Sequence, residues 1–427
     1  EVLVGFVAMD APTKRALNAD IDMRAHSGER VLGVIIAEVS ASALPPIDRI
    51  MEAGNFRFCG MVSFRDPLRP QVASAIRHIA AAGVRTVIVT GDHRGTAESV
   101  ARSLGMIDGH GRVLTGEDLV HLSRKELIAV AHEVVVYARV TPEQKVMLVQ
   151  LYQELGEVVA VTGDGVNDAP ALNAADIGVA VGSGTDVTKN AADLVILDDN
   201  FETIVSAIEE GRRMLENIRK AIVYLFSGSL DELLLIGGAL VFGIALPLNA
   251  LQILFVNFFS DSFPALAFAF ERGVGGLGTR NRRGDGIFDR RMRVLVLAVG
   301  VPTSVLLFVL YYLLLAWGLD GNLVRTFIFG TFAIYSLVLP FALRSLDRSI
   351  FSYNPFTNRA LTAGVGAGIM FTCAALYIPP LRDALGMVFL PPWWLVGVFA
   401  IGLFNISMAE AGKWFVRRNI DHTHHAS

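Results

Sequence analysis

The chain divides into two parts by the pattern of its apolar and polar positions. Up to about residue 215, short apolar runs end at polar residues or glycines, and helical patterns lie between several of them. Strands and helices that alternate in this way predict an α/β domain with a parallel sheet and helices on both faces. We expect strands at 84–89, 134–138, 158–161, 177–181 and 194–197, and helices at 72–82 and 96–104.

Long apolar stretches replace this pattern from about residue 218 onward. A helix crosses the hydrocarbon core of a bilayer with about 20 apolar residues. A single run of this length is compatible with a buried helix of a soluble protein, but several in succession predict an all-α bundle of transmembrane helices. We expect six spans, at 221–246, 248–270, 294–317, 323–343, 360–380 and 393–412.

Arginine is distributed unevenly over the connections between these stretches. The connections 271–293 and 344–359 and the C-terminal tail are rich in it, whereas the other three hold at most one positive charge each. Because Lys and Arg gather on the cytoplasmic side of membrane proteins, we expect the α/β domain and the C-terminus of an integral, multi-pass protein to be cytoplasmic.

Composition narrows the class of protein further. Hydrophobic residues make up 53% of the 427 residues and charged residues 18%, which excludes a disordered chain and disfavours a purely soluble one. The formal net charge is −4, so no overall basic field indicates a nucleic-acid partner.

The segment 162–170 gathers acids and an amide directly after the expected strand 158–161. In an open parallel sheet, ligands bind at the C-terminal ends of the strands. Asp164, Asn167 and Asp168 would lie at such an end, and their oxygens suit Mg²⁺. Taken alone, the segment is more often a simple turn.

Two further elements are placed in the same way. Thr90, Gly91 and Asp92 end the strand 84–89, where a hydroxyl and backbone N–H groups can bind a phosphoryl oxygen. Pro142 fits the first turn of a helix, which directs Lys145 towards the sheet edge and a phosphate. Taken singly, the first element is more often a helix cap and the second a solvated lysine.

Together the three elements resemble, in type and order, the phosphate-site motifs of the haloacid-dehalogenase-like phosphotransferases. Longer strings at 66–70, 90–92, 162–170 and 176–180 resemble the phosphorylation domain of P-type cation-transporting ATPases. The resemblance, with the six spans, covers nearly the whole chain. It implies an α/β haloacid-dehalogenase-like domain followed by six transmembrane helices.

The resemblance also implies roles for individual residues. Asp164 would bind Mg²⁺, Asn167 and Asp168 would shape the phosphate site, and Thr90 and Lys145 would contact the phosphoryl group. Asp92 resembles the family's hinge residue near the nucleotide, and Arg139 resembles a supporting basic residue that binds the cofactor. Gly91, between Thr90 and Asp92, belongs to the catalytic set. Such a site transfers the γ-phosphoryl group of ATP to an aspartate, and water then hydrolyses the aspartyl phosphate.

Several parts of that family's pattern do not occur in this sequence. The string Asp-Lys-Thr-Gly-Thr, which carries the phosphorylated aspartate, is absent from the 427 residues. By resemblance, 1–60 is the tail of a nucleotide-binding domain, 61–215 the phosphorylation domain, 216–415 the membrane domain and 416–427 a cytoplasmic tail. We therefore expect the C-terminal half of a pump, inactive without an N-terminal half.

Ionisable and polar residues also occur inside the expected spans, where they are costly and indicate function. The first span holds Asp231 and Glu232, and the second holds Asn257, Ser260 and Asp261. Pro264, four residues after Ser260, can free a backbone oxygen beside these side chains, which suits a hard cation. For Asp231, an interhelical hydrogen bond is an equally good reading.

The string 257–264 resembles the membrane motif of calcium pumps, with Ser260 and Ser262 in place of Thr and Gly. The resemblance makes Glu232, Asn257, Ser260 and Asp261 the ligands of the transported cation, with Ca²⁺ the leading candidate. The span 323–343 lacks the acid found in two-ion calcium pumps, so transport of Na⁺, K⁺, H⁺ or Mn²⁺ stays open. A non-catalytic membrane subunit that binds ions is the second alternative.

Overall fold

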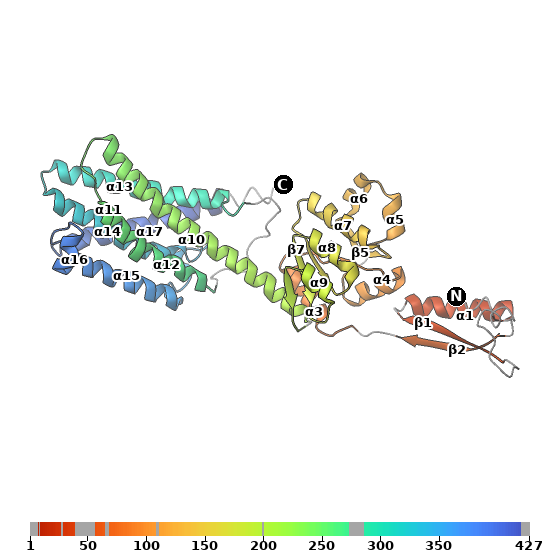
Figure 1. The fold of residues 1–427 in the computed structure, drawn as a ribbon. Coiled ribbons are helices and arrows are strands. Elements are labelled where there is room, and N and C mark those ends of the chain that lie inside the picture. Colours follow the sequence, from red (N-terminus) through yellow and green to blue (C-terminus); the bar gives the residue numbers. More distant parts are fainter. Residues whose placement is uncertain are drawn as a thin grey trace. The chain divides into compact units, whose positions relative to one another are not determined.

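A computed structural model describes residues 7, 9–26, 29–38, 56–64, 68–107, 111–198, 200–272 and 286–419. The described residues form two compact units, the first up to Ala207 and the second, here called the helical unit, from Ile208 onward (Figure 1). The positions 66–67, the stretch 273–285 and the tail 420–427, which contributed to the expectations above, lie outside the described residues.

The first unit begins with a helix and an antiparallel strand pair. Helix α1 (Ala11–His26) precedes β1 (Arg30–Ala37), which pairs with β2 (Phe56–Phe64). On these strands apolar side chains such as Leu32 and Phe64 are exposed.

The rest of the first unit is an α/β domain, as expected. Its strands form two parallel sheets of three strands each, in the orders β3-β5-β4 and β6-β7-β8. The strands are β3 (Ile88–Val89), β4 (Arg112–Thr115), β5 (Val134–Ala138), β6 (Ala160–Gly163), β7 (Ile177–Val181) and β8 (Leu194–Ile196). The helices are α3 (Val72–Ala81), α4 (Arg94–Ser103), α5 (Gly116–His121), α6 (Arg124–Val130), α7 (Pro142–Glu154), α8 (Ala169–Ala174) and α9 (Asp186–Ala191).

This arrangement differs from the expectation of a single sheet. The strand expected at 84–89 is regular only over Ile88–Val89, and its two ladder positions pair with β5. Among the described residues β3 therefore pairs with β5 alone, and the strands form two separate sheets.

Side-chain caps fix the starts of the helices that flank the site. At α5, Thr115 and Asp118 form a capping box, and at α7 Thr141 and Gln144 form another. Backbone and side-chain hydrogen bonds from Thr115 hold the pKa of the Asp118 carboxyl below its ordinary value. Pro142 is at the first position of α7, as its sequence context predicts.

The helical unit contains the six expected spans (Figure 1). Its helices are α10 (Phe201–Val241, which begins in the first unit), α13 (Arg290–Ala316), α14 (Gly321–Leu343), α15 (Arg359–Tyr377), the short α16 (Pro379–Ala384) and α17 (Trp394–Asn419). Helix α14 is almost entirely buried, because α13, α15 and α17 pack around it. It forms the core of the bundle.

The second span, between α10 and α13, is not one regular helix. It runs through α11 (Ala250–Phe255), the π-helical turn η3 (Val256–Asp261), α12 (Ser262–Ala267) and the 3₁₀ turn η4 (Phe268–Phe270). Pro264 cannot donate a backbone hydrogen bond, which loosens the preceding turn, and π-helical turns of this kind frequently mark functional sites.

Candidate functional site

The turn Thr90–Asp92 is joined by its backbone to the end of the neighbouring strand β5. The N–H of Thr90 donates to Tyr137 O at 2.9 Å, and the N–H of Arg139 donates to Asp92 O at 3.0 Å. The Asp92 N–H also donates to Thr90 Oγ1 at 3.1 Å. The C-terminal ends of β3 and β5 therefore present Thr90, Asp92 and Arg139 together, as the sequence predicts.

The helix-cap reading of this turn is wrong for Asp92. Helix α4 is capped by His93, whose Nδ1 accepts from the Gly95 N–H at 3.3 Å. Asp92 thus keeps its carboxylate outside the cap, where Thr90 Oγ1 lies 3.2 Å from Asp92 Oδ2.

Arg139 has a left-handed backbone with φ of 52°, which is uncommon for a residue other than glycine. Gly116 lies against this turn, and a Cβ at Gly116 would be 2.3 Å from Arg139 O. The Gln144 amide, at the start of α7, donates to Gly116 O at 2.8 Å. A glycine at 116 is therefore required for the backbone of Arg139 to pass so close.

Lys145 and Asp168 form an ion pair across the two parallel sheets. The Lys145 Nζ lies 2.6 Å from Asp168 Oδ1, and the side chains are only 17% and 16% exposed. Lys145 is in the first turn of α7, and Asp168 ends the 3₁₀ turn η2 (Val166–Asp168) that follows β6. The expected convergence of these two residues is present, and Lys145 is not a solvated surface lysine.

Asp168 is held in place by two glycines of the same loop. The Gly165 N–H donates to Asp168 Oδ2 at 3.3 Å. A Cβ at Gly163 would lie 2.5 Å from Asp168 Cβ and 2.9 Å from its Oδ2. The loop closes on Asp168 only because position 163 has no side chain.

Asp164 and Asn167, by contrast, are exposed at the end of β6. The Asp164 backbone oxygen accepts from the Thr185 N–H at 3.1 Å, and within the described residues its carboxylate makes no hydrogen bond or ion pair. In phosphoryl-transfer sites Mg²⁺ is held by one or two carboxylates together with waters and substrate phosphates. The exposed carboxylate of Asp164 fits that requirement.

In the helical unit, Asp261 is 8% exposed at the end of η3. The hydroxyl of Tyr224, on α10, lies 3.0 Å from Asp261 Oδ1 and 3.1 Å from Ser260 O. The Ser260 carbonyl thus accepts a hydrogen bond from another helix, and its role in binding a cation stays a prediction. The Ser260 hydroxyl is fully buried and has no hydrogen-bond partner among the described residues.

Glu232 and Asn257 adjoin this position from α10 and η3. The Asn257 side chain is exposed and hydrogen-bonds Glu232, and the charge of Asp261 acts on Glu232. Glu232 Oε1 is buried and has no hydrogen-bond partner within the described part of the chain.

Asp231 is fully buried and bonded to two neighbouring helices. The Ser304 hydroxyl of α13 lies 2.6 Å from Asp231 Oδ1, and the Tyr335 hydroxyl of α14 donates to Oδ2 at 2.8 Å. Asp231 therefore makes the interhelical hydrogen bonds that were one of its two predicted roles. Sequence reasoning missed the hydroxyl partners Tyr224, Ser304 and Tyr335, which only their position inside apolar spans could have indicated.

The three acids Asp231, Glu232 and Asp261 interact with hydroxyls, an amide and one another, and with no cationic side chain of the described residues. A buried carboxylate without a compensating charge is strongly unfavourable. The described residues hold no group of three His, Cys, Asp or Glu arranged for a metal ion. A cation here would therefore be bound by these carboxylates together with neutral oxygens. The Ser260 hydroxyl and the Glu232 Oε1 have no hydrogen-bond partner among the described residues.

These features define a class of protein: an α/β unit with a largely buried Lys145–Asp168 ion pair, followed by a membrane bundle with buried carboxylates. Comparison with protein families agrees. Residues 245–415 match the model described as cation transporting ATPase, C-terminus, and residues 19–176 and 146–208 match haloacid dehalogenase-like hydrolases. The chain is thus similar to cation-transporting ATPases in its helical unit and to haloacid dehalogenase-like hydrolases in its first unit.

Individual proteins that are similar to this chain are also named calcium- or cation-transporting ATPases. A calcium-transporting ATPase of Bacillus subtilis is 39% identical over 390 residues, covering 88% of this chain and 43% of that protein. A probable cation-transporting ATPase F of Mycobacterium tuberculosis is 38% identical, covering 84% and 40%. Calcium-transporting ATPase 1 of Schizosaccharomyces pombe is 38% identical, covering 77% and 38%. The chain spans less than half the length of these relatives.

Proposed function

We propose that this chain forms part of an ATP-driven P-type pump that exports Ca²⁺ from the cytoplasm through an aspartyl-phosphate intermediate. The observation that carries the proposal is the pair of sites in one chain, the Lys145–Asp168 pair in the first unit and the buried carboxylates of the helical unit. The continuous helix α10 joins the two units covalently. The names of the relatives support the cation.

In the phosphoryl site, the chain's own residues position and neutralise the transferring group. Lys145 supplies a positive charge held at a fixed place by Asp168, while the Thr90 hydroxyl and nearby backbone N–H groups orient phosphate oxygens. Asp164, with Asn167 beside it, would hold Mg²⁺, which when bound neutralises phosphate charge. Asp92 and Arg139 contact the nucleotide. The string Asp-Lys-Thr-Gly-Thr does not occur in these 427 residues, so the proposal requires a further segment that supplies the phosphorylated aspartate.

In the membrane, Asp261 and Glu232 provide the charge for the cation, and Asn257 and Ser260 provide neutral oxygens. The Ser260 hydroxyl oxygen and the Glu232 Oε1 have no hydrogen-bond partner among the described residues, and the transported cation binds to these oxygens. Positive side chains lie at the α13 start (Arg290, Arg291) and after α14 (Arg344, Arg348), and this distribution supports a cytoplasmic location for these ends and the first unit. The cation then enters from the cytoplasmic side.

A pump for another cation is the second candidate. Helix α14 contributes hydroxyls and no acid to the cluster, and one relative is named only as a cation transporter. Fewer carboxylates lower the charge available for a divalent ion. Na⁺, K⁺, H⁺ and Mn²⁺ are therefore the alternatives to test beside Ca²⁺.

The experiment is ATP-dependent ⁴⁵Ca²⁺ uptake into inside-out vesicles that contain this chain joined to the segment with the phosphorylated aspartate. We expect uptake that Asp261→Asn abolishes and that Ser407→Ala, an exposed hydroxyl on α17, leaves intact. ATPase activity without calcium uptake would contradict the calcium assignment and favour another cation. No ATPase activity would favour the non-catalytic subunit.

A further inference from the structure

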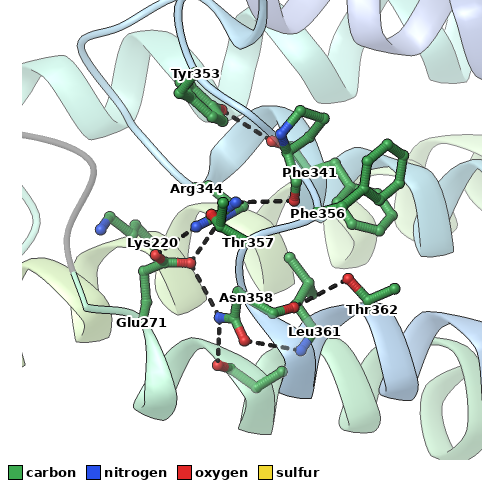
Figure 2. A network of polar contacts seen from close by, with 12 residues as sticks. Lys220, Glu271, Phe341, Arg344, Tyr353, Phe356, Thr357, Asn358, Leu361 and Thr362 are labelled. Atoms are coloured by element: carbon green, nitrogen blue, oxygen red, sulfur yellow. Dashed lines mark hydrogen bonds and ion pairs between the residues drawn. The ribbon is translucent and has the colours of Figure 1, made fainter.

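A second buried polar cluster lies in the helical unit, apart from the carboxylate site (Figure 2). It centres on Glu271, directly after η4, and is here called the Glu271 cluster. Its members come from four separate elements and are joined by side-chain hydrogen bonds and ion pairs. They are Asn217 and Lys220 of α10, Glu271, Arg344 at the end of α14 and Asn358 before α15.

Glu271 and Arg344 form a bidentate ion pair in the interior of the helical unit. The Arg344 Nε and Nη2 donate to Glu271 Oε2 and Oε1, each at 2.8 Å, and both side chains are at most 3% exposed. Arg344 Nη1 donates to the carbonyls of Asn354 and Pro355, each at 2.8 Å. Paired N–H···O bonds of this kind fix orientation as well as charge.

Burial by itself raises the pKa of Glu271, but hydrogen bonds from Arg344 and Asn358 outweigh it and hold that pKa below its ordinary value. The carboxylate therefore stays charged at neutral pH. Asn358 donates from Nδ2 to Glu271 Oε2 at 3.0 Å and to Ala267 O at 3.2 Å. The end of the second span is thereby held against the start of α15, which Asn358 caps.

Asn217 joins helix α10 to the backbone of Glu271. Its Nδ2 donates to the backbone oxygen of Glu271 at 2.9 Å. The fully buried Lys220 donates to Asn217 Oδ1 at 3.3 Å and pairs with Glu216 at 2.9 Å. Because Lys220 occupies the amide oxygen of Asn217, the amide nitrogen is the group that faces Glu271.

The Glu271 cluster thus joins the two elements that carry the membrane acids. Asn217 and Glu232 are on α10, and Glu271 follows Asp261 through the short, continuous α12 and η4. Helix α10 is also the element through which the chain passes from the first unit to the helical unit. A displacement of α10 at Asn217 therefore acts on the end of the segment that carries Asp261.

We propose that Glu271 is a positioning residue for the cation site, which couples α10 to Asp261 through the Asn217 contact. This inference rests on the proposed function, since it requires a cation at Asp261 and Glu232. Arg344 and Asn358 hold the Glu271 side chain, and Asn217 holds its backbone, so the distance between the two acid-bearing helices is set at this point.

The test is equilibrium ⁴⁵Ca²⁺ binding to the whole chain in lipid nanodiscs, with thermal unfolding followed by tryptophan fluorescence. All four tryptophans lie in the helical unit, so the fluorescence reports that unit. Asn217→Ala removes the contact between α10 and Glu271 and the long Lys220 bond to the Asn217 amide oxygen, while Lys220 keeps its ion pair with Glu216. We expect the variant to weaken calcium binding by about tenfold, a typical size for coupling between linked sites, with little change in Tm. Glu271→Gln should weaken binding and also lower Tm.

The matched control is Lys413→Met. The buried Lys413 ammonium bonds Ala342 O at 2.6 Å, Arg348 O at 3.0 Å and Glu410 at 2.7 Å, which joins α17 to the end of α14. Its loss should lower Tm as Glu271→Gln does and leave the calcium affinity unchanged.

Two results would overturn the inference while the proposed function stands: wild-type affinity in both Asn217→Ala and Glu271→Gln, or an equal loss of affinity in Lys413→Met. If the wild-type chain binds no calcium at all, the proposed function fails and the inference fails with it.

Discussion

A methyl group added at Gly163 tests the geometry of the phosphoryl site most sharply. The Cβ of Gly163→Ala would lie 2.5 Å from Asp168 Cβ and 2.9 Å from its Cγ and Oδ2. The backbone of Gly163 is outside the left-handed region, so alanine meets no conformational penalty there. The whole cost is therefore the displacement of the Asp168 side chain from its place beside Lys145.

The magnitude follows from two contributions that overlap. Overfilling a packed site costs about 1–3 kcal/mol. Losing the 2.6 Å contact between Lys145 and Asp168 removes a charged hydrogen bond, and such bonds contribute about 1.5–3 kcal/mol. We expect about 2–3 kcal/mol in total, which at 1.36 kcal/mol per factor of ten lowers the rate of phosphoryl transfer roughly 30- to 160-fold.

The assay is the initial rate of phosphoenzyme formation from radiolabelled ATP, with this chain joined to the segment that bears the phosphorylated aspartate. Gly165→Ala is the matched control in the same loop. Its Cβ would be 3.7 Å from Asp168 Oδ2, an ordinary contact, and its φ of −104° suits alanine. We expect the control to stay within about twofold of the wild type, as for surface substitutions.

A Gly163→Ala rate within twofold of the wild type would refute the reasoning, because Asp168 would then tolerate displacement. An equal fall in Gly165→Ala would also refute it, since the loss would come from the loop in general.

Three further predictions concern the first unit. Lys145→Met leaves a carboxylate without its counter-charge and should lower phosphoenzyme formation by at least about tenfold in the same assay. Gly116→Ala places a methyl 2.3 Å from Arg139 O and should lower the free energy of unfolding by about 1–3 kcal/mol, measured as faster hydrogen exchange in β4 and β5. The Asp118 pKa is lowered in the folded state, so its cap stabilises the unit above about pH 4 and is lost as pH falls through the lowered value. Asp118→Asn should therefore reduce the acid-induced loss of protection in α5, measured by hydrogen exchange between pH 7 and pH 3.

The elements best predicted from sequence are those fixed by local pattern. The strands Val134–Ala138 and Ile177–Val181 have the predicted bounds, because apolar runs bordered by polar residues mark buried strands. The six spans follow from length and hydropathy in the same way. The approach of Lys145 to Asp168 was predictable because both follow strand ends in a parallel arrangement.

Other features depend on contacts between distant residues and left no local signal. The π-helical turn at Val256–Asp261 coincides with the Tyr224 hydroxyl, 36 residues before the Ser260 carbonyl that it contacts. The Glu271–Arg344 pair joins positions 73 residues apart. In the sequence, Arg344 reads only as one of the positive charges that orient the spans. The division of the described strands into two sheets also left no local signal.

The most direct test of the central claim is the calcium dependence of phosphoenzyme formation from ATP, since it requires both sites to act together. The account predicts an acid-stable phosphoenzyme that forms only when free Ca²⁺ is present, that Asp261→Asn abolishes, and that Ser407→Ala leaves at wild-type levels. Phosphoenzyme formation that is independent of calcium, or that survives in Asp261→Asn with unchanged calcium dependence, would contradict it.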